Sequence, residues 1–309
     1  MGSVIIIGAG IAGLACARKL HGAGVRVRVF EKSRSVAGRC ASRRFEEAII
    51  DTGLQYFTAT TDRFLAEVQA LVGPALQTLK LPALNEAMQP LGKPTKFYHA
   101  DGNNRLGNAL AEGLHIEREH PVTQIDTNAG KWIVDGEECD AVVSSAPWPQ
   151  TAGLLGQSDD AGYYACLTAA FAYSGAPTGL TASIYGIGGR GALAWSACEN
   201  AKTGRVPSGA TVMIAQAGPE FSEEHFEMNR ELWGTSLRAM VEARWEIDSG
   251  RFVSQFTHRW KYARRAIAIP AAEKLPAGFF VTGDSLAASR LEDVWYSGEK
   301  SADAVLAWI

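Results

Sequence analysis

Residues 4–31 combine glycines, a helix start and an acidic residue at spacings that suit a phosphate-containing ligand. A β-branched run leads into Gly8-x-Gly10-x-x-Gly13, a helical pattern continues to about residue 20, and residues 25–30 form a second predicted strand. The first glycine allows a tight turn, the second lets a pyrophosphate approach the backbone, and the third lets helix and strand pack closely. The helix N-terminus then faces the negative charge of the phosphates.

Glu31 ends the second predicted strand, where a carboxylate accepts hydrogen bonds from ribose hydroxyls. An ordinary strand–helix–strand unit, with glycines placed only for packing, is the alternative interpretation. Because the glycines, both strands, the helix and the spacing to the acid all agree, we favour an adenine dinucleotide site. The predicted contacts in this segment are Gly8, Gly10, Ile11, Ala12, Gly13 and Glu31.

Two further segments favour FAD over NAD as the dinucleotide. A cationic turn follows directly after the acid, and its Lys32 and Arg39 are expected to reach the same pyrophosphate. Far along the chain, residues 279–284 are an apolar strand that ends in Gly283 and Asp284, for which a simple turn is the alternative. A cofactor contacted from both ends of a 309-residue chain is long, and this favours FAD.

A helical pattern from about Ser297 to Trp308 follows this strand. We expect its N-terminus, at Ser297, to point at the N1/C2 edge of a flavin. There the helix dipole would stabilise the anionic reduced form by about 0.3–2 kcal/mol. Local motifs suggest neither a Ser-His-Asp nor a Cys-His arrangement, and the six histidines lack metal-binding spacing. We therefore predict flavin chemistry with no protein nucleophile and no metal.

Together these motifs resemble the flavin-containing amine oxidase superfamily and, within it, the bacterial type of the renalase family. The resemblance is carried by GAGIAGLACA…FEK…AGR, by FFVTGD, and by residues 51–58, 101–106 and 258–263. It runs essentially end to end and is specific mainly in residues 4–58, 96–110, 256–264 and 279–298. The family turn is often Gly-Gly-Arg, whereas this chain has Ala37-Gly38-Arg39, which changes only one small residue.

The resemblance implies an oxidase that takes hydride from 2- or 6-dihydro-NAD(P) and passes the electrons to dioxygen, giving NAD(P)+ and hydrogen peroxide. Forming an aromatic pyridinium requires no general base, which agrees with the lack of an obvious one. A flavin-dependent amine oxidase and a noncatalytic FAD-binding scaffold are the alternatives. The resemblance also implies noncovalent FAD, because covalent-flavin monoamine oxidases carry a cysteine near the C-terminus and Cys198 is the last one here.

The resemblance suggests further contacts. Gln55 and Tyr56 lie in the segment that runs beneath the isoalloxazine, and Val122 stands where the family places a main-chain contact to adenine. A buried polar residue and an ordinary strand residue are the respective alternatives. Residues that combine cations and aromatic rings suit a dinucleotide substrate, and the candidates are Phe57, Thr58, Lys96, Tyr98, Arg290 and Tyr296. The basic and aromatic residues 259–265 are a further candidate, with a solvated basic face as the alternative.

The predicted fold is α/β with an α+β second lobe. A Rossmann-type FAD-binding domain is assigned to residues 1–60, 101–160 and 265–309, and a discontinuous, mixed, largely antiparallel substrate lobe to residues 61–100 and 161–264. The predicted helices include residues 61–72, 105–112 and 230–245. A three-stranded meander is expected over 116–123, 131–134 and 139–145, and further strands over 96–98, 167–173, 182–186, 192–197 and 211–215.

Composition narrows the class of protein. A hydrophobic content of 47%, a charged content of 20% and a net charge of −3 are typical of a soluble globular protein. They give no reason to expect nucleic acid or a membrane as a partner. The five scattered cysteines suggest reduced thiols and a cytoplasmic location. No basic region precedes the apolar residues 4–15, so we do not expect a signal peptide.

Overall fold

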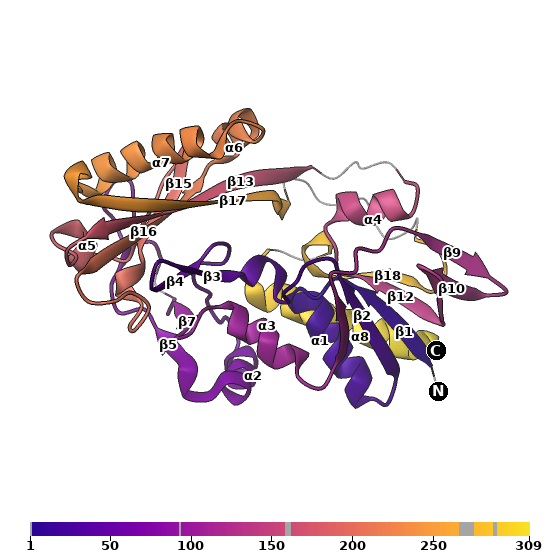
Figure 1. Ribbon diagram of the computed structural model, residues 1–309. Coiled ribbons are helices and arrows are strands. Elements are labelled where there is room, and N and C mark those ends of the chain that lie inside the picture. Colours follow the sequence, from indigo (N-terminus) through magenta and orange to yellow (C-terminus); the bar gives the residue numbers. More distant parts are fainter. Residues whose placement is uncertain (1, 93, 158–161, 266–274, 287–288) are drawn as a thin grey trace.

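The computed structural model describes residues 2–92, 94–157, 162–265, 275–286 and 289–309. One lobe is built on a five-stranded parallel sheet in the order β18-β12-β1-β2-β8 (Figure 1). Its strands are β1 (Ser3–Ile7), β2 (Arg26–Glu31), β8 (His115–Arg118), β12 (Ala141–Ser144) and β18 (Phe279–Val281). The two chain ends meet at this lobe.

Both faces of the parallel sheet are covered, because its strands are apolar on both sides. Val4 and Ile6 of β1 pack into a core with the helices, whereas Ile5 and Ile7 pack into a second core that contains Trp132. The helices of the first core are α1 (Ile11–Gly22), α2 (Asp62–Val72), α3 (Asn104–Ala111) and α8 (Leu291–Trp308). On the other face lie α4 (Trp148–Leu154) and an antiparallel sheet of β9 (Ile125–Asn128), β10 (Lys131–Val134) and β11 (Glu137–Cys139).

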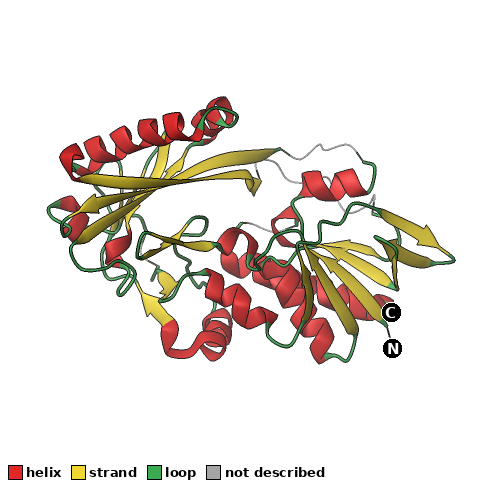
Figure 2. Cartoon of the chain, in the orientation of Figure 1, coloured by secondary structure: helices red, strands yellow, loops and turns green. Residues whose placement is uncertain are grey.

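The second lobe is a six-stranded sheet in the order β17-β13-β16-β15-β14-β6. Its strands are β6 (Ala83–Asn85), β13 (Tyr163–Ser174), β14 (Gly186–Gly188), β15 (Leu193–Cys198), β16 (Ala210–Ala217) and β17 (Phe252–Arg265). All pairs are antiparallel except β14 with β6. Figure 2 shows a long helix along the outer side of this sheet, α7 (Arg230–Trp245). It buries Trp233, Leu237, Val241 and Trp245, which lie four residues apart.

Smaller elements lie between and around the two large sheets. The hairpin of β3 (Ser42–Phe45) and β4 (Ala48–Asp51) packs on the inner face of the six-stranded sheet, where Phe45 contacts Phe256. A further pair is β5 (Leu76–Thr78) with β7 (Phe97–His99), and the described helices also include α5 (Leu180–Ser183) and α6 (Pro219–His225). Short 3₁₀ turns include η1 (Gly38–Cys40), η2 (Gly73–Ala75), η3 (Glu199–Ala201), η4 (Ser249–Arg251) and η6 (Gly283–Ser285).

The predicted fold class is confirmed: a Rossmann-like parallel sheet accompanies a mixed, largely antiparallel one. The predicted meander is wrong. Its first and third strands, β8 and β12, belong to the parallel sheet, and the small antiparallel sheet uses β9, β10 and β11 instead. The first strand ends early because the chain turns at Glu119, where φ is 57°. Residues 182–186 are also not one strand, because α5 precedes β14 there.

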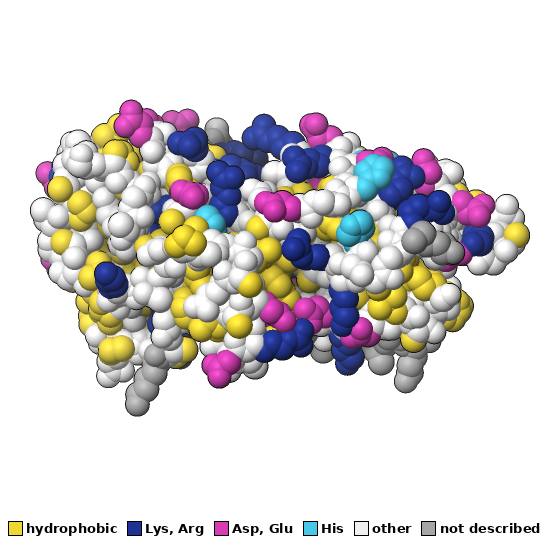
Figure 3. Space-filling view, turned by 90° about the horizontal axis from the view of Figure 1, so that it is seen from below, with side chains coloured by type: hydrophobic (Ala, Val, Ile, Leu, Met, Phe, Trp, Pro, Cys, Tyr) yellow, Lys and Arg dark blue, Asp and Glu magenta, His cyan; other side chains and the backbone are white. Residues whose placement is uncertain are grey.

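Surface charge is mixed. On the face shown in Figure 3, basic and acidic side chains are interspersed with apolar and uncharged areas. Within the described ranges, no helix is long and apolar enough to cross a membrane. The five cysteines are all free thiols.

Candidate cofactor site

The carboxyl ends of the parallel strands bring the predicted cofactor residues to one edge of the sheet. Gly8 follows β1 and donates its N–H to Phe30 O at 2.8 Å, while Ser145 follows β12 and donates to Gly8 O at 2.8 Å. Gly283 follows β18 at the same edge. Ligands of doubly wound sheets bind at this edge, so segments far apart in sequence form one candidate site.

The three glycines have different surroundings. A Cβ added to Gly13 would lie 2.2 Å from Gly8 O, so this glycine allows α1 to pack against the turn. Gly8 has φ 97°, a left-handed conformation that favours glycine. A Cβ added to Gly10 would meet no atom of the described residues within 4 Å. Gly10 is the N-cap of α1 and has no side-chain cap, so open space adjoins the free N–H groups of Ile11 and Ala12. This cradle fits a pyrophosphate.

Glu31 is buried beside this turn, with 7% of its surface exposed. Its Oε2 accepts the Ala9 N–H at 2.7 Å, and its Oε1 accepts the Ser33 N–H at 2.7 Å. These bonds fix the carboxylate, and each oxygen keeps a second lone pair for a ribose hydroxyl. Lys32, by contrast, is exposed to solvent.

Arg39 and Asp284 lie together, but they bind one another. Arg39 Nη1 and Nη2 donate to Asp284 Oδ2 and Oδ1 at 2.5 and 2.7 Å, and Nη1 also reaches Ala263 O at 3.2 Å. Arg39 is thus held by Asp284, and its expected contact with the pyrophosphate stays a prediction. Its bidentate pair connects the 37–39 turn to η6, at the start of the C-terminal segment.

The change from Gly-Gly-Arg to Ala-Gly-Arg affects more than side-chain size. Ala37 has φ 80°, in the left-handed region, which costs an ordinary residue about 1–2 kcal/mol. Its methyl group lies against α3, where a Cβ at Gly107 would come within 2.5 Å of it. Because Gly107 has no side chain, it leaves room for the methyl group of Ala37.

Residues 51–57 connect the two lobes. Gln216 Nε2 donates to Gly53 O at 2.7 Å, and Trp260 Nε1 donates to Thr52 O at 2.9 Å. Gln55 is buried, and its Nε2 donates to the carbonyls of Asp51 and Gly53. Its Oε1 is buried and has no hydrogen-bond partner within the described structure. A buried acceptor without a donor fits the polar N–H edge of a flavin.

Tyr56 stands beside Gln55 in a group of aromatic rings. Its ring centroid lies 6.0 Å from Tyr185 and 5.7 Å from Trp195. Lys96 Nζ lies 5.6 Å from the Tyr56 centroid and donates to Leu91 O at 3.0 Å. Burial raises the pKa of the Tyr56 hydroxyl above its ordinary value. Lys96, one of the predicted substrate residues, therefore lies beside the predicted flavin segment although it is distant in sequence.

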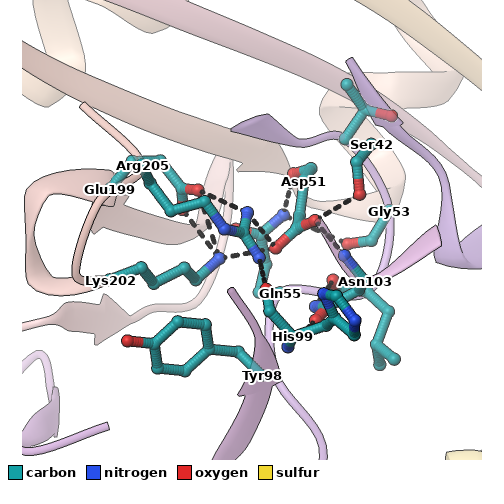
Figure 4. Close-up of polar contacts among 12 residues, drawn as sticks. Ser42, Asp51, Gly53, Gln55, Tyr98, His99, Asn103, Glu199, Lys202 and Arg205 are labelled. Carbon is teal, nitrogen blue, oxygen red and sulfur yellow. Dashed lines mark hydrogen bonds and ion pairs between the residues drawn. The ribbon is translucent and has the colours of Figure 1, made fainter. Parts of the chain in front are cut away.

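A buried ion cluster lies behind this segment, and sequence analysis missed it (Figure 4). Asp51 Oδ2 accepts from Lys202 Nζ at 2.8 Å and from Arg205 Nη1 at 2.9 Å, and Glu199 Oε1 accepts from Lys202 at 3.0 Å. All four side chains are fully buried. Burial disfavours the Asp51 carboxylate, but the two cations outweigh it and lower the Asp51 pKa. Burial raises the Glu199 pKa. Residues 199–205 are polar and aperiodic, so no sequence signal placed them in a core.

Two predicted substrate residues have their side chains in the interior. Phe57 is 3% exposed and packs against Phe64 and Phe97. Tyr98 is 1% exposed, and its hydroxyl accepts the Thr203 N–H at 3.0 Å. Both belong to segments that hold the lobes together.

The other predicted substrate residues are dispersed. Arg290 is an exposed N-cap residue of α8 that pairs with Asp293 at 2.8 Å. Tyr296 lies on α8 against α2, with its hydroxyl 3.3 Å from Thr61 Oγ1 and the Arg63 guanidinium 4.8 Å from its ring. Thr58 is half-buried. The structure does not gather these residues into one site.

The expected start of the C-terminal helix is wrong. α8 begins at Leu291, so Ser297 lies inside the helix and cannot offer its N-terminal N–H groups to a flavin. Ser297 Oγ instead accepts the Gly283 N–H at 3.0 Å and so supports the turn after β18. Val122 is not in a strand; it lies half-buried between β8 and β9. No group of three or more His, Cys, Asp or Glu residues is placed to hold a metal within the described chain.

Comparisons with known proteins agree with this architecture. The model of the NAD(P)-binding Rossmann-like domain matches residues 6–71, and the model of the flavin containing amine oxidoreductase family matches residues 71–306. A curated relative, 4-hydroxybenzoate brominase (decarboxylating) from Marinomonas mediterranea, is 30% identical over 168 residues. That match covers 50% of this chain and 28% of the relative, so the chain spans less than a third of that protein.

Solved structures share the fold at low sequence identity. A candidate protoporphyrinogen oxidase from Exiguobacterium sp. 255-15 superposes with a TM-score of 0.81, at 14% identity and 98% coverage of both chains. Reduced UDP-galactopyranose mutase gives 0.80, at 11% identity, covering 100% of this chain and 96% of that one. Putrescine oxidase bound to putrescine gives 0.71, at 13% identity and 99% coverage of both chains. Since a family model matches residues 71–306 and the glycine cradle fits a dinucleotide, this chain belongs to the flavin-containing amine oxidoreductase family and its cofactor is FAD.

Proposed function

We propose that this protein is a renalase-like oxidase that converts 2- or 6-dihydro-NAD(P) to NAD(P)+. The balanced reaction is dihydro-NAD(P) plus dioxygen and a proton, giving NAD(P)+ and hydrogen peroxide. Membership of the flavin-containing amine oxidoreductase family supports an oxidoreductase. The resemblance of residues 51–58, 101–106 and 258–263 to the renalase family supports the dihydronicotinamide substrate.

The observation that favours this substrate over an amine is the positive charge that lies next to the aromatic rings beside Gln55. An amine oxidase binds a cationic amine, often among aromatic rings. Here Lys96 Nζ lies 5.6 Å from the Tyr56 ring, and Lys202 Nζ lies 5.5 Å from the Tyr185 ring. The Tyr56 ring therefore already faces a cation of the chain itself, whereas the charge of Lys202 is balanced by Asp51 and Glu199. A substrate amine would meet like charge, whereas a neutral dihydropyridine ring would not.

FAD, when bound, supplies the hydride acceptor and the route to dioxygen. The chain's own residues position the substrate and exclude water. Trp260 and Gln216 hold the carbonyls of Thr52 and Gly53, which fixes the segment that carries Gln55 and Tyr56. Loss of hydride makes the nicotinamide ring aromatic, so the reaction needs orientation rather than a general base.

We also propose a division of the chain between the two tasks, in which α2 packs in the core of the parallel-sheet lobe although its residues fall in the substrate range. We assign residues 1–60, 101–160 and 265–309 to FAD binding and residues 61–100 and 161–264 to the substrate. FAD is held noncovalently in this proposal. We place the protein in the cytoplasm, where its five free thiols stay reduced.

Steady-state turnover in air tests this function. We expect the purified yellow protein to form one hydrogen peroxide for each NAD(P)+ when 2- or 6-dihydro-NAD(P) is supplied. Primary and secondary amines, tested at the same concentrations, should give no peroxide above the buffer control. Peroxide from an amine but from neither isomer would favour the amine oxidase alternative, and no turnover with any reductant would favour the noncatalytic scaffold.

A further inference from the structure

The β3–β4 hairpin lies along the inner face of the edge strand β17. Phe45 packs on Phe256 with ring centroids 6.2 Å apart, and Ser254 Oγ donates to Glu46 Oε1 at 2.6 Å. Side chains alternate along a strand, so Arg43 shares the face of Phe45, and His258 shares the face of Phe256. This register, in which the two segments run in opposite directions, places Arg43 beside His258.

Arg43 is a half-buried cation with no counter-charge among the described residues. Its Nη1 donates to Ser42 O at 3.0 Å, and the guanidinium forms no other hydrogen bond or ion pair with the described residues. Burial, followed by the nearby Arg34, lowers the Arg43 pKa, yet a guanidinium stays protonated in proteins. Four of its five donors therefore have no partner among the described residues and are free to bind an anionic ligand.

The surroundings of Arg43 increase the positive potential. Neither Arg34, in the turn after β2, nor Arg230, at the start of α7, pairs with a carboxylate of the described chain. Burial, then Arg43 and Arg230, lowers the pKa of His258 to about 4, so its ring is neutral at pH 7 and retains one N–H donor. The carboxylate that the hairpin places nearby, that of Glu46, is bound to Ser254.

This cationic face is continuous with the flavin-binding segment. The His258 and Trp260 rings lie 4.4 Å apart, and Trp260 Nε1 donates to Thr52 O at 2.9 Å. A Cβ on Gly53 would lie 3.3 Å from the Trp260 ring. A ligand with a flat ring near Gln55 and Tyr56 would therefore have Trp260, His258 and then Arg43 along its path.

We propose that Arg43, Arg34 and His258 form a binding site for the phosphate groups of the dinucleotide substrate. The proposal rests on the proposed function and adds to it the part of the substrate that the chain recognises. Guanidinium groups match phosphate oxygens in shape and charge, and such bonds are charge-assisted. Phosphates of FAD have the same chemistry, so the test separates the two sources.

The test compares Arg43→Gln with Arg44→Gln in the FAD-loaded protein. Arg44 is the next residue of β3, is exposed, points to the opposite face, and has no ion pair within the described chain, so its loss removes the same charge. Calorimetric titrations use ADP, NAD+ and nicotinamide riboside, which lacks phosphate. We expect Arg43→Gln to weaken ADP and NAD+ binding by about ten- to a hundredfold and to leave riboside binding unchanged. Arg44→Gln should change each affinity by less than about twofold.

Flavin content and thermal unfolding, measured on the same samples, show whether each variant is folded and loaded. His258→Asn is the second variant, and it should weaken ADP binding without altering flavin content. Equal affinities in wild type and Arg43→Gln would overturn the proposal. Loss of FAD with unchanged ADP affinity would assign the site to the cofactor and also overturn it. Because these titrations involve no turnover, their result is separate from a failure of dihydronicotinamide isomers to reduce the flavin.

Discussion

Replacing Gly10 with alanine should remove FAD without unfolding the protein, because the added methyl group enters the space that the pyrophosphate needs. Within the part of the chain that the structure describes, the methyl meets no atom within 4 Å, and φ at this position is −74°, which any residue adopts. We expect FAD affinity to fall by about a hundredfold or more, the loss of two hydrogen bonds to a charged group. Absorbance of bound flavin after desalting, together with thermal unfolding of the apoprotein, measures both effects.

Gly13→Ala is the matched control for this prediction. Its methyl would lie 2.2 Å from Gly8 O and 2.6 Å from Ser145 Oγ, so it should destabilise the apoprotein itself by about 1–3 kcal/mol. Retention of FAD by Gly10→Ala, or an equal loss of apoprotein stability in both variants, would contradict the assignment of the cradle.

Lys202→Met should produce the largest loss of stability. It leaves the carboxylates of Asp51 and Glu199 buried with Arg205 as their remaining cation. Breaking a buried ion pair by removing one partner costs about 3–5 kcal/mol. Lys19→Met is the control, because Lys19 pairs with Asp303 at the surface and such pairs contribute under about 1 kcal/mol. Denaturant titration at pH 7 compares the two.

The pH dependence of the Lys202→Met effect follows from Glu199. Burial already raises the Glu199 pKa, and losing Lys202 raises it further, so the folded variant binds a proton that the unfolded chain releases. When the pKa of a group is raised in the folded state, the free energy of unfolding falls as the pH rises. The variant should therefore be less destabilised near pH 5 than near pH 8. An equal deficit at both values, or a deficit no larger than that of Lys19→Met, would contradict the buried cluster.

Local pattern was sufficient for the elements in which neighbouring residues decide the structure. The GxGxxG turn has its expected geometry because Gly8, Gly10 and Gly13 each meet a local steric requirement. Helix α7 has the predicted bounds because its buried residues recur every four positions. Each feature is determined by the residues of one short segment. The family resemblance extended the dinucleotide site to FAD.

Features that depend on distant partners were not predictable in this way. Strand β17 mixes charged and aromatic residues, and it forms because β13 supplies a long antiparallel partner. The Asp51, Glu199, Lys202 and Arg205 cluster joins segments about 150 residues apart, and no local motif marks it. Phe57 and Tyr98 resembled ligand-binding aromatics, but Phe57 packs in the core of the parallel-sheet lobe and Tyr98 is bonded to Thr203. The pairing of Arg39 with Asp284 was not predicted either, because Asp284 comes from the other end of the chain.

Anaerobic mixing tests the central claim most directly, because it observes flavin reduction without dioxygen. Hydride transfer requires the donor carbon within about 3–3.5 Å of its acceptor, so the bound pose selects which ring carbon reacts. We predict that micromolar 2- or 6-dihydro-NAD(P) bleaches the flavin absorbance within seconds, whereas ordinary 4-dihydro-NADH and catecholamines leave it unchanged. Rapid bleaching by an amine, with none by either dihydronicotinamide isomer, would contradict the account.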